Sequence, residues 1–181
     1  MRFDLLDEAF TLTDVLLIAD THIGPGSAAV LTSKLSEHLA AVDVVLHAGD
    51  LTDMSVVDAL LEAAPHVSVH AVAGNLDHHL HLPNRLELDI AGCAVALVHD
   101  SGPAPGRRRR LRRWFPNADL VVFGHSHLPW HEVDVRPLDG HTQHHVNPGS
   151  AVLRRRAPTC TIARVLLAGK CVVDVRHAAI H

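Results

Sequence analysis

The sequence contains few aromatic residues and few cysteines, and it has no tyrosine at all. Aromatic residues make up only 3% of the 181 residues. Proteins that bind single-stranded nucleic acid stack bases on aromatic side chains, so this scarcity disfavours that function. The three cysteines, Cys93, Cys160 and Cys171, lie in apolar, strand-like stretches without a Cys-x-x-Cys spacing. We therefore expect three buried, reduced thiols and no zinc knuckle.

The sequence also lacks a long apolar run and a secretory signal. No N-terminal segment joins a basic start to an apolar centre and a small-residue cleavage site, and every apolar run is far shorter than a membrane span. We expect a cytoplasmic protein without a membrane partner. The net charge of −4 is small, so it excludes neither nucleic acid nor small anionic substrates. The length and the hydrophobic fraction of 48% predict one packed domain over residues 1–181.

What is present is a regular alternation of short apolar runs with segments of helical periodicity. In the first half, the order strand, helix, strand, helix, strand predicts a parallel sheet with right-handed crossovers. The second half predicts antiparallel strands, with a hairpin around Ala91-Gly92. The fold class that follows is an α/β sandwich of two mixed β-sheets with helices outside. Strands are predicted at 15–19, 44–48, 67–73, 85–90, 94–98, 119–123, 132–136, 142–146, 161–167 and 171–176, and helices at 27–40, 53–64 and 106–115.

Side chains that can bind metals directly follow five of the predicted strands. Ligands of open α/β sheets bind beyond the carboxyl ends of the strands, so we expect these side chains to gather at one edge. Carboxylate and imidazole groups suit manganese, iron, zinc and cobalt. Seven groups are too many for one ion. They suit two ions about 3.5–4 Å apart, which can hold a hydroxide between them and stabilise an in-line displacement at phosphorus.

The motifs that carry these groups occur in the order Asp20-x-His22, Gly49-Asp50, Gly74-Asn75-x-Asp77, His99 and Gly124-His125-x-His127. In order and spread they resemble the calcineurin-like metallophosphoesterase family. A later Asn-Pro-Gly-Ser segment at 147–150 resembles its small bacterial YfcE-type phosphodiesterase branch. The resemblance covers nearly the whole chain and implies the four-layer sandwich of metallophosphoesterases.

The resemblance also implies a metal-dependent phosphodiesterase that uses two divalent ions, manganese first, with iron, zinc, nickel or cobalt as alternatives. A hydroxide that bridges the ions would attack phosphorus. Asp50, His99 and His125 would be the catalytic residues, Asp50 would bridge the ions, and Asn75 would also contact the substrate. The first ion would bind Asp20, His22 and His127, and the second would bind Asn75, His99 and His125.

Two positions depart from the family pattern. Many members have a histidine directly after the asparagine as proton donor to the leaving group, whereas this chain has Leu76. The YfcE-type branch also lacks a histidine at this position. The general acid is therefore unassigned, with His78 and His79 as candidates, and such an acid contributes about 10²–10⁴ in rate. We therefore predict faster hydrolysis of esters with acidic leaving groups. Asp100 is the second departure, because many relatives have His-Gly-His where this chain has His99-Asp100.

The arginines between residues 107 and 113 permit three interpretations. They form a solvated helix face, or they contact nucleic-acid phosphates, or they attract anionic substrates toward His99. In the third interpretation Arg107 is the candidate for substrate binding. A second basic cluster, Arg154 to Arg156, follows the Asn-Pro-Gly-Ser segment.

Several other functions stay open. A nuclease or a nucleotide-specific phosphodiesterase or phosphatase would use the same site. A scaffold resembling a retromer subunit, or a metal-storage protein rich in histidine, would not need catalysis. The seven intact positions favour catalysis on a small phosphate ester over nucleic acid, and the resemblance is compatible with a homo-oligomer, either dimer or tetramer. We expect Asp77 to make a supporting hydrogen bond, and His47, His66 and His70 to lie within strands without a role in the motifs.

Overall fold

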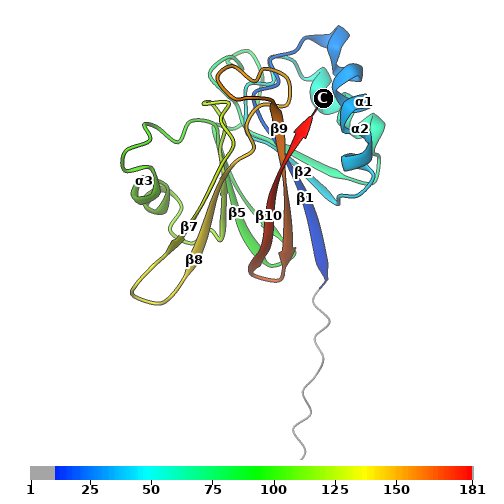
Figure 1. Ribbon diagram of the computed structural model, residues 1–181. Coiled ribbons are helices and arrows are strands. Elements are labelled where there is room, and N and C mark those ends of the chain that lie inside the picture. The colour runs from blue at the N-terminus through cyan, green and yellow to red at the C-terminus, as the bar shows by residue number, and fades with distance from the viewer. Residues whose placement is uncertain (1–10, 181) are drawn as a thin grey trace, which may run out of the picture.

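The strands of the protein form two five-stranded mixed sheets that face each other (Figure 1). The computed structural model describes residues 11–180. In the first sheet the strand order is β10-β9-β1-β2-β3. The pairs β1–β2 and β2–β3 are parallel, and β9 runs antiparallel to both β1 and β10. The bounds are β1 Leu12–Ile18, β2 Val44–His47, β3 Ser68–Ala71, β9 Cys160–Ala168 and β10 Cys171–Ile180.

The second sheet comes from the middle of the chain and has the order β4-β5-β6-β8-β7. The three central strands β5, β6 and β8 are parallel, and each edge strand is antiparallel to its neighbour. At the tight turn between β4 and β5, Ala91 and Gly92 have φ of 52° and 88°, as a two-residue hairpin with a primed turn requires. The bounds are β4 Arg85–Ile90, β5 Cys93–Val98, β6 Leu120–Val122, β7 Trp130–Val135 and β8 Thr142–Asn147.

Successive residues of the central strands point to opposite faces, which gives the molecule its layers. Val15 and Leu17 of β1 pack into the core between the sheets, whereas Leu16 and Ile18 pack against the helices outside. All four are fully buried. A strand that is apolar on both faces belongs in the middle of a sheet, and β1 occupies that place.

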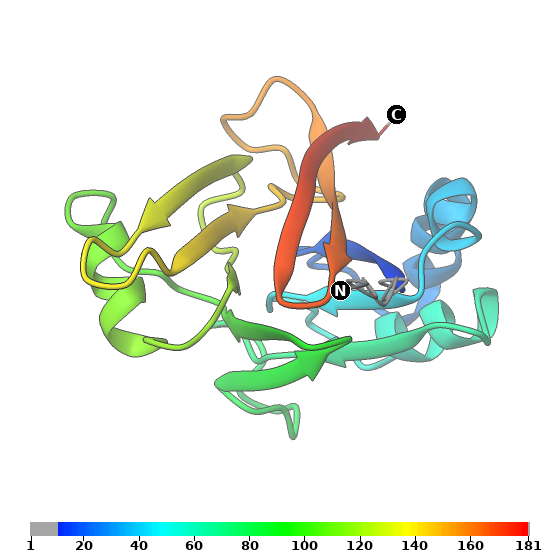
Figure 2. The same cartoon turned by 90° about the horizontal axis from the view of Figure 1, so that it is seen from below.

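The helices cover the two outer faces and complete the four layers. After a short 3-10 turn (η1, Pro25–Ser27), helix α1 (Ala28–Leu39) lies beside α2 (Ser55–Ala63) on the first sheet. Helix α3 (Arg107–Trp114) covers the second sheet from the other side. Figures 1 and 2 show α3 at the opposite end of the molecule from α1 and α2. Within residues 11–180, none of the helices has the length and apolar character that a membrane crossing requires.

The predicted elements and the α/β sandwich are confirmed, and two details are corrected. The second half of the chain is not antiparallel throughout, because β5, β6 and β8 are parallel and the C-terminal hairpin joins the first sheet. Helix α2 begins at Ser55 with Met54 as its N-cap residue. Asp53 nevertheless supports this end, because its carboxylate accepts a hydrogen bond from the Ser55 N–H at 2.8 Å.

The prediction of three buried cysteines is confirmed for Cys93 and wrong for Cys171. Cys93 is fully buried, and burial raises the pKa of its thiol to about 12. Cys160 is half-buried, and its thiol donates to the Val152 carbonyl. Cys171 is exposed because it begins β10, directly after the two-residue turn of the last hairpin. All three are free thiols.

Candidate metal centre

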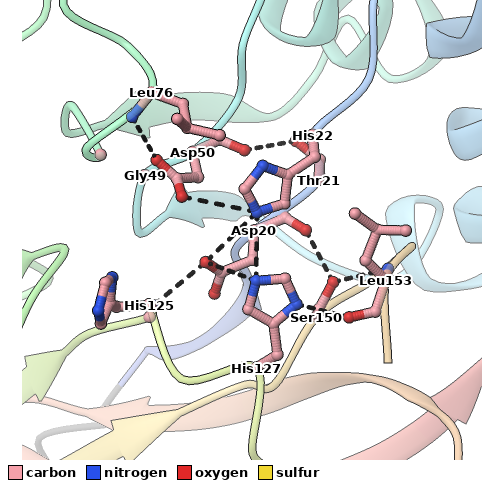
Figure 3. Close-up of polar contacts among 12 residues, drawn as sticks. Asp20, Thr21, His22, Gly49, Asp50, Leu76, His125, His127, Ser150 and Leu153 are labelled. Carbon is pink, nitrogen blue, oxygen red and sulfur yellow. Dashed lines mark hydrogen bonds and ion pairs between the residues drawn. The ribbon is translucent and has the colours of Figure 1, made fainter. Parts of the chain in front are cut away.

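The loops that follow β1, β2, β3, β5 and β6 bring the predicted ligands together at one edge of the sheets. Two groups of side chains place their donor atoms within 4.8 Å of one another, and Asp20 belongs to both groups. Figure 3 shows the side chains of Asp20, His22, Asp50 and His127 facing one another. The first group is Asp20, His22 and His127, and the second is Asp20, Asp50 and His99.

In the first group, two imidazoles point their Nε2 atoms at the same place. His22 Nε2 and His127 Nε2 lie 3.2 Å apart, and their rings stack. Asp20 Oδ1 lies 3.3 Å from His127 Nε2 and 3.9 Å from His22 Nε2. The Nδ1–H of His127 donates to the Leu153 carbonyl at 2.5 Å, which leaves the Nε2 lone pair free to bind a cation.

The second group is arranged in the same way around His99. Its Nδ1–H donates to the Ala48 carbonyl at 2.7 Å, so that its Nε2 is free. Asp50 Oδ2 lies 3.5 Å from His99 Nε2 and 3.5 Å from His22 Nε2. Asn75 Oδ1 lies 3.1 Å from His99 Nε2 and 3.1 Å from His125 Nδ1. The carboxylate of Asp50 therefore lies between the two sets of imidazoles.

The electrostatics of this cluster fit a bound cation. Burial, together with the neighbouring Asp50, raises the pKa of Asp20 from 3.8 to about 7, although the charge of His99 opposes this rise. Its Oδ2 atom is buried without a hydrogen-bond partner. Burial also lowers the pKa of both His22 and His127, which favours neutral imidazoles that can act as ligands. The donors are thus of the kinds that transition metals accept, and a cation would satisfy the buried oxygen.

The backbone of these loops adopts a conformation that residues other than glycine rarely take. Within residues 11–180, eight non-glycine residues have positive φ, and five of them are predicted ligands. Such residues cost of order 1–3 kcal/mol each and persist where the surroundings enforce them. The five are Asp20, His22, Asp50, His125 and His127, with φ between 49° and 68°.

Two glycines leave room for the carboxylates. A Cβ on Gly124 would lie 2.9 Å from Asp20 Oδ2. A Cβ on Gly74 would collide with the backbone nitrogen and the carboxylate of Asp50. Gly124 and Gly74 directly precede His125 and Asn75 in the motifs. Each glycine lies close to atoms of another ligand-carrying loop, where a larger residue would not fit.

Supporting hydrogen bonds hold the loops in register. Asp77 is fully buried, and its carboxylate accepts from the backbone N–H groups of Leu51, Thr52 and Gly74 at 3.1, 2.7 and 2.8 Å. The supporting role predicted for Asp77 is confirmed, because these bonds tie the loop after β3 to the loop that carries Asp50.

The sequence did not reveal the part that His47 plays. This residue is fully buried at the end of β2, where its Nδ1 accepts from the Gly49 N–H at 3.2 Å and its Nε2 lies 3.1 Å from Thr21 Oγ1. It therefore connects the segment Asp20–His22 to the segment Gly49–Asp50. The one available signal was a histidine inside an otherwise apolar strand. His70 lies in β3, but His66 is exposed and lies outside the strand, contrary to expectation.

The remaining candidates lie at or beyond the rim of the cluster. His79 Nε2 lies 3.1 Å from the Thr52 carbonyl, and His78 is exposed. Arg107 stacks its guanidinium over Phe123 and Trp130 at 5.1 and 5.2 Å, and its Nε is buried without a partner. Within residues 11–180 it makes no hydrogen bond or ion pair with the seven predicted ligands.

Comparisons with known proteins agree with this geometry. A family model described as the calcineurin-like phosphoesterase superfamily domain matches residues 14–170. A probable metallophosphoesterase of Methanothermobacter thermautotrophicus is 30% identical over 154 residues, which cover 82% of this chain and 84% of that protein.

Two solved structures show the same fold. Vacuolar protein sorting 29 from Cryptosporidium parvum has a TM-score of 0.68 and 23% identity, covering 94% of this chain and 99% of the other. The phosphoesterase YfcE from E. coli has a TM-score of 0.55 and 21% identity, covering 93% and 100%. The region matched by the family model contains every residue of the two donor groups. The chain therefore belongs to the calcineurin-like phosphoesterase superfamily.

Proposed function

We propose that this protein is a phosphodiesterase that holds two divalent ions at the cluster, with manganese first and iron, zinc, nickel or cobalt as alternatives. The observation that carries the proposal is the position of Asp50, whose Oδ2 lies 3.5 Å from both His22 Nε2 and His99 Nε2. A carboxylate between two sets of imidazoles suits two ions better than one. Membership in a metal-dependent phosphoesterase superfamily supports the same conclusion.

In this proposal each part of the chain has a defined task. Asp20, His22 and His127 would hold one ion, Asn75, His99 and His125 would hold the other, and Asp50 would be shared between them. When bound, such a pair of ions supplies Lewis acidity toward the phosphoryl oxygens and lowers the pKa of water to give a nucleophile. The carbonyls of Ala48 and Leu153 fix the imidazoles of His99 and His127. The exposed Asn75 and His125 are the ligands that a substrate approaches first.

The first experiment tests metal and activity together. Metal-free protein is refilled with each ion and assayed with bis(4-nitrophenyl) phosphate, while metal content is measured by elemental analysis. We expect about two ions per chain and hydrolysis that falls by roughly 10²-fold or more in Asp50→Asn and in His99→Ala. Asp58→Asn makes the same chemical change on the exposed face of α2 and should behave as wild type. A folded wild-type protein that stays inert with every ion would favour the scaffold function instead.

A second experiment tests the missing proton donor. The Leu76 side chain is 48% exposed, and its backbone N–H donates to Asp50 Oδ1 at 2.9 Å. The leucine side chain has no ionisable group, so it cannot protonate a leaving group. We expect the rate for a series of aryl phosphodiesters to rise steeply as the pKa of the leaving phenol falls. Equal rates across that series would show that a general acid, such as His78 or His79, is present.

A further inference from the structure

The loop between β8 and β9 reaches back to the metal centre. Ser150 Oγ donates to the Asp20 carbonyl at 2.7 Å and accepts from the Leu153 N–H at 2.9 Å. The Leu153 carbonyl accepts from Nδ1–H of His127. Figure 3 shows Ser150 and Leu153 beside Asp20 and His127. The residues that directly follow Leu153 in this loop therefore begin at a point that contacts the cluster.

Arg155 has an unusual backbone in this loop. Its φ is 44°, in the left-handed region that an arginine rarely adopts. Of the other seven non-glycine residues with positive φ within residues 11–180, Ala91 lies in a hairpin turn and six lie in the loops that carry the predicted ligands. A strained residue that the fold maintains beside a site is a reason to look for function there.

The guanidinium of Arg155 is exposed and has no partner within residues 11–180. Its neighbour Arg154, by contrast, donates to the Ala157 and Pro158 carbonyls at 3.4 Å. Arg155 is only two positions along the chain from Leu153, whose carbonyl accepts from Nδ1–H of His127, and the same loop contacts Asp20 through Ser150. An unpaired cation beside a site for divalent ions is repelled by them unless an anion lies between.

We infer that Arg155 is a substrate-binding residue, whose guanidinium donates to a non-bridging phosphoryl oxygen on the side of Asp20, His22 and His127. The inference rests on the proposed function and names a substrate contact for it. A guanidinium presents a planar pair of N–H donors that matches phosphate oxygens, and the resulting charge-assisted bonds are stronger than neutral ones. The loop would thus orient a ligand imidazole through Leu153 and bind the substrate through Arg155.

The test compares Arg155→Gln and Arg155→Lys with Arg156→Gln, an exposed arginine at the next position of the same loop. Steady-state kinetics on bis(4-nitrophenyl) phosphate should show KM raised about 10- to 100-fold in Arg155→Gln with kcat changed much less. The lysine variant should recover part of the loss because it keeps the charge. Arg156→Gln should match wild type, and the metal content should be the same in all.

Titration calorimetry with inorganic phosphate on the manganese-loaded proteins gives a readout that does not depend on turnover. Phosphate should bind Arg155→Gln about 10- to 100-fold more weakly than wild type. Unchanged phosphate affinity and unchanged KM in Arg155→Gln would overturn the inference, as would an equal loss in Arg156→Gln. A wild-type protein that binds phosphate but hydrolyses no diester would instead overturn the proposed function, and the phosphate titration would still decide the role of Arg155.

Discussion

At the scale of single residues, the site depends on backbone conformations as much as on side-chain chemistry. Five predicted ligands adopt positive φ, and Gly74 lies so close to Asp50 that no Cβ fits between them. The predicted ligands are thus held close together by loops that follow different strands. A mutation that adds a single methyl group at such a contact should disturb metal binding without removing any ligand.

Gly74→Ala tests this directly. The added Cβ would collide with the Asp50 backbone, which cannot move away as a flexible side chain could. We expect the metal-free protein to lose about 1–3 kcal/mol of unfolding free energy, measured by urea titration, and to bind fewer ions at a fixed manganese concentration. Gly26→Ala is the matched control, because a Cβ there meets nothing within 4 Å. Full metal content in Gly74→Ala would show that the loops are more adaptable than the contact indicates.

The same scale shows what sequence could and could not predict about the site. Asp20, Asp50 and His99 could be found because each follows an apolar strand and has side-chain chemistry suited to a metal. The roles of the Leu153 carbonyl and the His47 imidazole could not be predicted, because each pairs with a group 26 residues away along the chain, the His127 imidazole and the Thr21 hydroxyl respectively. Such a contact depends on how the loops meet in space and leaves no pattern along the chain.

At the scale of elements, α3 shows how an ambiguous charge pattern is resolved by packing. Arg112 is not a solvated residue: it donates from Nε to Asp134 Oδ2 at 2.8 Å and from a terminal nitrogen to His141 Nδ1 at 2.9 Å. His141 in turn lies 3.0 Å from Asp119 Oδ1. Arg108 is exposed but adds ion pairs to Glu132 and Asp134 of β7 at 3.6 and 3.4 Å. Arg109, by contrast, is exposed without an ion pair within residues 11–180, as the solvated-face interpretation predicts.

Arg112→Ala should therefore destabilise the fold, whereas Arg109→Ala should not. Removing the guanidinium breaks the hydrogen bonds of Arg112 to the half-buried Asp134 and His141, which we expect to cost about 2 kcal/mol of unfolding free energy, while Asp134 keeps its ion pair with Arg108 and His141 its contact with Asp119. Arg109 makes no hydrogen bond or ion pair within residues 11–180, so its loss should change that free energy by less than about 0.5 kcal/mol. Urea unfolding followed by circular dichroism measures both. Equal stability of the two variants would contradict the role assigned to Arg112.

At the scale of the whole molecule, local periodicity predicted the elements better than their assembly. The run at 15–19 was predicted as a strand from its apolar residues, and its burial on both faces agrees with its central place in the first sheet. The two C-terminal strands were predicted, but nothing in their own alternation tells which sheet edge they join. That choice is made by the pairing of β9 with β1, a contact between the two ends of the chain. Long-range pairing of this kind has no local signature.

The packing of α3 on the second sheet also affects how the fold responds to acid, through His145 in β8, which pairs with Val121 on the face that α3 covers. This imidazole is fully buried, and burial lowers its pKa from 6.5 to about 4. Its Nε2–H donates to Gln143 Oε1 at 2.7 Å, and its Nδ1 is buried without a partner, so protonation there would create an unpaired charge. In the unfolded chain the same histidine takes up a proton below about pH 6.5, whereas the folded protein resists it down to about pH 4. The unfolded state therefore binds more protons in this window, and stability falls as the pH drops.

His145→Gln should remove this acid sensitivity while keeping an N–H donor for Gln143. With urea unfolding of the metal-free protein, the wild-type free energy of unfolding should fall between pH 7 and pH 4 by roughly 3 kcal/mol more than that of the variant. His66→Gln replaces an exposed histidine and should follow the wild-type curve. Chelation of all metal is necessary, because proton uptake by the ligands would otherwise add its own pH dependence. Parallel curves for wild type and His145→Gln would contradict this prediction. They would show that His145 takes up its proton as readily in the folded protein as in the unfolded chain, despite its burial.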